Sequence, residues 1–184
     1  MDEKTWISLG SIALGGIGKL GIEWYKKRNS DKDDDILIVS GRIQYEIKNF
    51  SDNNKVDRFL ILRVPVSKKN RKLRVVFEHT RIKSVYNLYQ DFKPDDGYFE
   101  DLDKAIESGF LIKAIKDINS TVLADFYKSE NIINNHIFII HKTRKYIYYG
   151  SCVSKKSDFE DFMFKVNFNS LLSFLVSKFK KYAK

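Results

Sequence analysis

The first 28 residues contain the feature that most limits how this chain can fold. Between Trp6 and Ile22 the only charged residue is Lys19, and five of the nine glycines lie between Gly10 and Gly21. In water each interior glycine costs a helix about 1 kcal/mol relative to alanine. In a bilayer the backbone must satisfy its own hydrogen bonds, so a glycine-rich helix is tolerated there. The segment therefore predicts a helix whose natural surroundings are lipid or another protein.

The ends of this segment carry the residues that favour a membrane interface. The side chains expected to meet the apolar surroundings are Trp6, Leu9, Ile12, Leu14, Ile17, Leu20, Trp24 and Tyr25. Lys26, Lys27 and Arg28 follow, and positive charge after a span predicts that this side faces the cytoplasm. Because the run is close to the low limit of about 17 residues for a span, three interpretations stay open: a short membrane anchor, an interfacial helix, and a helix buried against a hydrophobic protein partner.

The rest of the chain has the composition of one globular domain. Hydrophobic residues make up 43% and aromatic residues 14% of the 184 residues, which is typical of a folded chain rather than a disordered one. Residues 29–35, NSDKDDD, form a polar hinge, and residues 36–184 form the predicted domain. A single cysteine, Cys152, excludes an internal disulfide and is expected to be a buried thiol.

Helical periodicity opens and closes this domain. Apolar residues recur every three or four positions over residues 36–50 and again over residues 158–181, which predicts two helices packed through one face. Ser157 or Asp158 is expected to cap the second of them. Shorter helices are predicted over residues 98–107, closed by Gly109, and after Ser120.

Five strands are predicted between these helices, over residues 57–66, 73–79, 110–115, 136–142 and 146–153. The first is apolar on both faces, with Phe59 and Ile61 on one and Leu60, Leu62 and Val64 on the other, so it is expected to be central. The second is expected to place Leu73, Val75, Phe77 and His79 on one side. The predicted fold class is α+β, with a five-stranded, mostly antiparallel sheet that carries the N- and C-terminal helices on one face.

This element order, together with the VDRFLIL strand at 56–62, resembles that of GAF and PAS domains. With the apolar N-terminus added, the whole chain is similar to small proteins of bacteria and their phages that place a short membrane helix before such a domain. The resemblance implies a small-molecule-sensing or dimerising module. The apolar segment and the cations after it predict an inner-membrane-associated protein with a cytoplasmic domain, in the host cell if the chain is phage-encoded.

The sequence contains no motif of a known catalytic or cofactor-binding site, so we expect a non-enzymatic protein without a cofactor. The three histidines, His79, His136 and His141, have no metal-ligand spacing and are expected to be structural or on the surface. The acidic residues between Asp95 and Asp103 are better explained by a helix N-terminus than by a metal site. The aromatic residues Tyr86, Tyr89, Phe92 and Tyr98 are candidates for a ligand pocket over the sheet.

The net charge of +9 suggests an anionic partner surface. Contact with it is expected from Lys26, Lys27, Arg28, Lys68, Lys69 and Arg71. The sequence thus predicts a membrane-tethered sensory or scaffold domain, with a homo-oligomer left open. The alternative is a nucleic-acid- or virion-associated structural protein. The positive charge allows it, but the sequence lacks the aromatic residues in the order of an RNP motif that stack on bases, so nucleic acid is not favoured.

Overall fold

The structure is a computed structural model that describes residues 41–69, 71–156 and 159–182. The predicted N-terminal apolar helix, the hinge at 29–35 and the cations Lys26, Lys27 and Arg28 lie outside these residues. So do Ser157 and Asp158.

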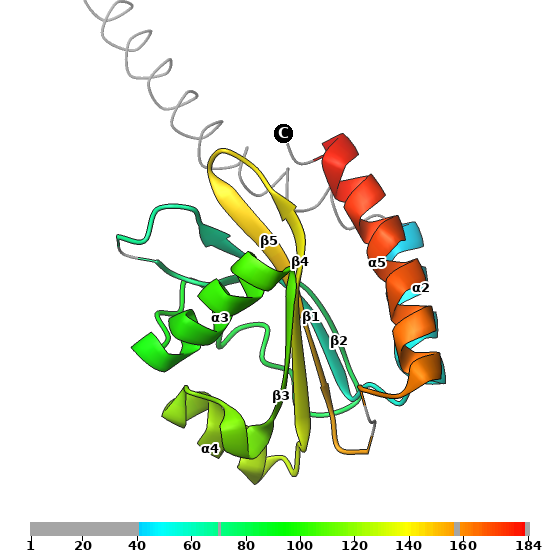
Figure 1. The fold of residues 1–184 in the computed structure, drawn as a ribbon, viewed down its shortest axis with the longest axis horizontal. Coiled ribbons are helices and arrows are strands. Elements are labelled where there is room, and N and C mark those ends of the chain that lie inside the picture. Colours follow the sequence, from blue (N-terminus) through cyan, green and yellow to red (C-terminus); the bar gives the residue numbers. More distant parts are fainter. Residues whose placement is uncertain (1–40, 70, 157–158, 183–184) are drawn as a thin grey trace, which may run out of the picture. The chain divides into compact units, whose positions relative to one another are not determined.

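A five-stranded antiparallel sheet forms the centre of the domain (Figure 1). Its strands are β1 (Arg58–Pro65), β2 (Arg74–Thr80), β3 (Phe110–Ala114), β4 (Asn134–Lys142) and β5 (Tyr146–Ser154). They lie in the order β2-β1-β5-β4-β3, and every neighbouring pair is antiparallel. The predicted hairpins β1–β2 and β4–β5 are both present, so the predicted sheet is confirmed.

Strand β1 is central and buried on both faces, as its composition predicts. Phe59 and Ile61 belong to one hydrophobic core, while Leu60, Leu62 and Val64 belong to a second core on the other side of the sheet. The two cores explain why the chain needs so many large apolar residues in one sheet of modest size.

In the described part of the chain, helices cover both faces of the sheet (Figure 1). The helices α2 (Gly41–Asn53) and α5 (Phe162–Tyr182) pack on the first core, through residues such as Ile43, Ile47 and Phe179. The helices α3 (Asp96–Ser108) and α4 (Thr121–Ser129), with the short 3-10 turn η1 (Ile115–Asp117), pack on the second. The prediction that the N- and C-terminal helices share a face is confirmed.

A β-bulge changes which way the end of β2 faces. Ile61 pairs with Phe77 but Leu62 pairs with Val75, so Val76 is the extra residue. Because a bulge reverses the alternation, Val75 packs in the second core while Phe77 packs against the first. The prediction that Leu73, Val75, Phe77 and His79 lie on one side is therefore wrong.

Helix α5 begins later than its periodicity predicts. The Asp161 carboxylate accepts hydrogen bonds from the backbone N–H groups of Met163 at 2.9 Å and Phe164 at 3.1 Å. Asp161 thus acts as the N-cap and stabilises a start at Phe162. Phe159 precedes the helix and is still fully buried in the first core.

The caps of α3 and α4 agree with the sequence. The Asp95 side chain accepts from the Tyr98 N–H at 3.0 Å, and Gly109 ends α3 with a φ of 87°. Ser120 accepts from the Leu123 N–H at 3.1 Å and starts α4. These caps position the two helices that form the walls of the candidate site.

Candidate functional site

A cavity of about 230 Å³ lies on the side of the sheet that carries α3 and α4, between these helices and the loop of residues 81–95, here called the roof loop. Leu88, Tyr89, Phe92 and Pro94 of the roof loop line it. Asp95, the last residue of the roof loop, and Leu73, directly before β2, also line it. Helix α3 supplies Tyr98, and α4 with its N-cap supplies Ser120, Val122, Leu123 and Phe126. Apart from Asp95, Ser120 and the phenol groups of Tyr89 and Tyr98, this lining is apolar.

Three of the four aromatic residues predicted for a pocket, Tyr89, Phe92 and Tyr98, line this cavity. Tyr86 does not line it, because its backbone N–H binds Glu78 and its side chain is exposed. That a ligand occupies the cavity stays a prediction. The contribution of Leu123 and Phe126 from α4 was not predicted, because their spacing in the sequence is also that of ordinary helix packing.

Behind the cavity lies a buried pair of tyrosines, of which Tyr98 lines the cavity and Tyr149 does not. The hydroxyl groups of Tyr98 and Tyr149 lie 2.9 Å apart and share a hydrogen bond. Burial is the main cause that raises the pKa of both phenols above the ordinary value near 10. Burial also raises the pKa of Tyr89 to about 12. These phenols therefore stay neutral and act as hydrogen-bonding groups rather than as bases.

A buried ion cluster of Arg58, Glu78 and Glu130 holds the roof loop in place. The Arg58 side chain is 1% exposed and donates to Glu130 Oε1 at 2.8 Å and to the Lys83 carbonyl at 2.6 Å. Its Nε lies 3.6 Å from Glu78 Oε1. The guanidinium also lies 5.5 Å from the ring centre of Phe126, a cavity wall. One side chain thus joins β1, the roof loop and the end of α4.

Glu78 and Gln90 complete the attachment of the roof loop. The Glu78 carboxylate accepts the backbone N–H groups of Val85 at 2.9 Å and Tyr86 at 3.1 Å. The Gln90 amide donates to the carbonyls of Val75 and Tyr86, both at 3.1 Å. The cavity roof is therefore a bonded part of the fold, and the cavity is held open in advance of any ligand.

The acidic residues near α3 serve the fold. Asp95 caps the helix, and Asp101, which is 3% exposed, binds Lys113 Nζ at 2.7 Å and the Asn119 N–H at 3.0 Å. Across residues 41–69, 71–156 and 159–182, no group of three or more His, Cys, Asp or Glu side chains is arranged to hold a metal ion.

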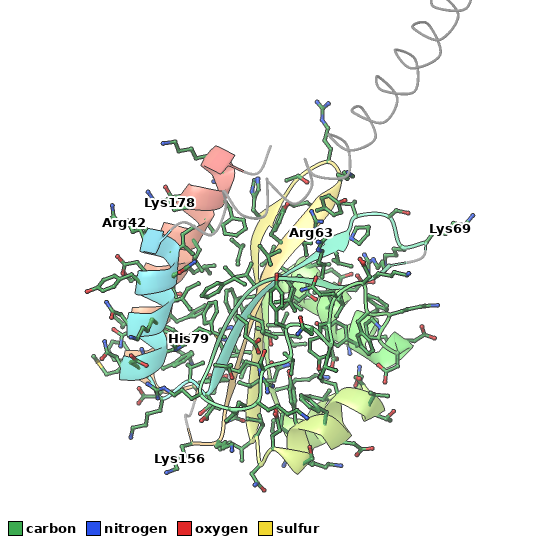
Figure 2. All side chains as sticks on the ribbon, turned by 180° about the vertical axis from the view of Figure 1, so that it is seen from behind. Arg42, Arg63, Lys69, His79, Lys156 and Lys178 are labelled. Carbon is green, nitrogen blue, oxygen red and sulfur yellow. The ribbon has the colours of Figure 1, made fainter. Side chains whose placement is uncertain are left out.

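Two of the predicted anion contacts are already paired. Asp103 binds Lys68 Nζ at 2.8 Å and Arg71 Nη1 at 2.7 Å. Burial opposes the charge of Asp103, but the hydrogen bonds from these two cations lower the pKa of its carboxyl group. Lys69 projects outward at the tip of the same turn (Figure 2). The turn therefore presents less positive charge than its sequence indicates.

Cys152 is fully buried, as predicted, and burial raises the pKa of its thiol. A protonated, inaccessible thiol is a poor nucleophile.

Among the helices of the described residues, none combines the length and the apolar character that crossing a membrane requires.

No protein-family model matches the sequence, and no curated protein sequence matches it. Solved structures do match. The GAF domain of a two-component sensor histidine kinase from Bacillus halodurans is 14% identical, with a TM-score of 0.54 over 75% of this chain and 93% of that one. A GAF domain region from Geobacter sulfurreducens is 17% identical, with a TM-score of 0.54 over 84% and 98%.

The chromophore-binding domain of a bacteriophytochrome from R. palustris is also similar. It is 10% identical, with a TM-score of 0.53 over 84% of this chain and 62% of that one. At such identities the likeness concerns the fold alone. The antiparallel sheet, its strand order and these structures together show that the described part of the chain has the GAF-domain fold.

Proposed function

We propose that the domain is a sensory module that binds one small, mainly apolar molecule in the cavity under the roof loop and acts without catalysis. The observation that carries the proposal is the cavity itself, which is lined by apolar side chains and closed by a loop bonded to the sheet. Concave, mostly apolar pockets with a few placed polar groups are the usual form of a small-molecule site. Among proteins of the same fold, one neighbour is a chromophore-binding domain and another belongs to a sensor kinase.

The chemistry of the lining selects the class of ligand. The volume of the cavity, about 230 Å³, is below the roughly 300 Å³ at which pockets for drug-sized ligands begin. The oxygens of Asp95 and Ser120 are already engaged by backbone N–H groups of α3 and α4. The Arg58 cation contacts Phe126 and does not line the cavity. The expected ligand is therefore compact, uncharged and mainly apolar.

A cavity-filling variant tests this proposal. Leu123→Trp should fill the space under the roof loop, and a screen of small uncharged molecules by protein-observed NMR should find ligands that shift the signals around Tyr98 and Phe126 in the wild type only. Asp125→Trp is the matched control, because Asp125 lies in the same helix, has a side chain that is 80% exposed and does not line the cavity. Binding that survives Leu123→Trp unchanged would place the ligand elsewhere and refute the proposal.

We further propose that residues 1–28 attach this domain to the inner face of a membrane through residues 29–35. The support is in the sequence: the apolar, glycine-rich run between aromatic residues, followed by three cations. Expression of the chain with and without residues 1–28, followed by fractionation, tests it. Full-length protein that remains a monomer in the soluble fraction contradicts the proposal.

A further inference from the structure

A second cavity of about 230 Å³ lies on the opposite face of the sheet, between β3, β4 and α5. Its buried lining consists of His136, Phe159, Phe164 and Phe168. His136 is thus the one polar residue among these buried walls. The cavity under the roof loop belongs to the other core, so the two cavities are separated by the sheet.

His136 has no hydrogen-bond partner, although it is only 3% exposed. Neither Nδ1 nor Nε2 is paired, which is costly because an unsatisfied buried polar group loses about 1–3 kcal/mol of hydration free energy. Burial lowers the pKa of the imidazole to about 4, so the ring is neutral at neutral pH. A neutral imidazole presents one donor and one acceptor, and both are unused here.

The surroundings of the imidazole are aromatic. Its ring centre lies 4.5 Å from that of Phe168, 5.4 Å from that of Phe138 and 6.1 Å from that of Phe110. Phe110 begins the edge strand β3 and is 53% exposed, so it borders the cavity on the solvent side. A flat ring that enters beside Phe110 would meet aromatic faces and, behind them, the imidazole.

The mouth of the cavity disfavours an anionic ligand. Lys165 and Asn169 of α5 line the cavity from its exposed side. The Lys165 ammonium is bound to the Glu160 carboxylate at 2.6 Å, so its charge is already balanced. The cavity exceeds the volume of about 150 Å³ at which an engineered apolar cavity holds benzene. These features together fit a single uncharged aromatic ring.

We propose that this cavity is a second ligand site, which binds a small uncharged aromatic molecule carrying one hydroxyl group, and that the hydroxyl pairs with a ring nitrogen of His136. A purely apolar pocket rejects a hydroxyl group because burial leaves it unpaired. The pairing with His136 reverses that preference. Selection of phenol over benzene is therefore the mark of this site.

The full-length chain, labelled with ¹⁵N in its three histidines, provides the test. Phenol should shift the imidazole ¹⁵N signals of His136 and bind about threefold to tenfold more tightly than benzene, the factor expected for one net hydrogen bond. In His136→Leu the order should reverse, with phenol at least about fivefold weaker than benzene. Leu123→Trp, which fills the other cavity, should leave phenol binding at His136 unchanged.

Two results would overturn the proposal. One is that neither probe shifts the His136 signals, and the other is that phenol keeps its advantage in His136→Leu. Should the leucine variant not fold, Asn169→Trp replaces it, because a large ring at the exposed mouth should block entry and abolish the phenol-induced shift. A shift that persists in Asn169→Trp would show that phenol does not enter by this cavity and would equally refute the site.

Discussion

Replacing His136 with leucine should remove a large part of the pH dependence of stability. The imidazole is 3% exposed and lies among phenylalanine rings, so burial lowers its pKa from 6.5 to about 4 in the folded state. The unfolded chain binds the proton more strongly than the folded one. Stability from this group is therefore fully present above pH 6.5 and is lost as the pH falls towards 4.

The magnitude follows from the size of the shift. One pKa unit corresponds to about 1.4 kcal/mol, so lowering the pKa from 6.5 to about 4 corresponds to about 3 kcal/mol in total. Between pH 7 and pH 4.5 the wild type should lose about 2–3 kcal/mol through His136 alone. The nearby charged pair, Lys165 with Glu160, sits at the exposed mouth and should change this loss little. At pH 7 the leucine variant should be at least as stable as the wild type, since it removes two unpaired nitrogens.

Urea unfolding followed by far-ultraviolet circular dichroism measures this difference at both pH values. His79, whose pKa is also lowered chiefly by burial, contributes equally to both proteins and cancels in the comparison. The expected result is that the free energy of unfolding falls by about 2–3 kcal/mol more in the wild type than in His136→Leu. An equal fall in the two proteins, within about 0.5 kcal/mol, would show that the imidazole is not held neutral by burial.

Three further substitutions test the contacts that hold the fold. Arg58→Met should cost about 3–5 kcal/mol, because it leaves the carboxylate of Glu130 buried without its cation, and a thermal melt measures the loss. Gly150→Ala should cost about 1–3 kcal/mol, since the new methyl group would overlap the Phe138 ring. The double variant with Phe138→Leu should recover stability, and a double variant that recovers none would contradict this cause. Asp161→Ala should cost about 1 kcal/mol as a lost N-cap, and urea unfolding that shows no change would refute its capping role.

Local signals in the sequence were sufficient to predict the helices and strands and their order along the chain. The two-faced apolar pattern of β1 placed it in the centre of the sheet, where it pairs with β2 and β5. Asp95, Gly109 and Ser120 marked helix ends because capping depends on residues within one turn of the end. Such features are determined by near neighbours in the chain, so they can be predicted without knowledge of the fold.

Partners that are distant in the sequence decided the rest. The bulge at Val76 depends on how β2 pairs with β1. The charge of Lys68 and Arg71 is balanced by Asp103, more than 30 residues away. The unpaired state of His136 exists only because β3, β4 and α5 converge on it. The amino-acid sequence thus determined which residues are apolar, capping or charged, and the tertiary structure alone decided which of them meet, because burial and electrostatic pairing are properties of neighbours in space.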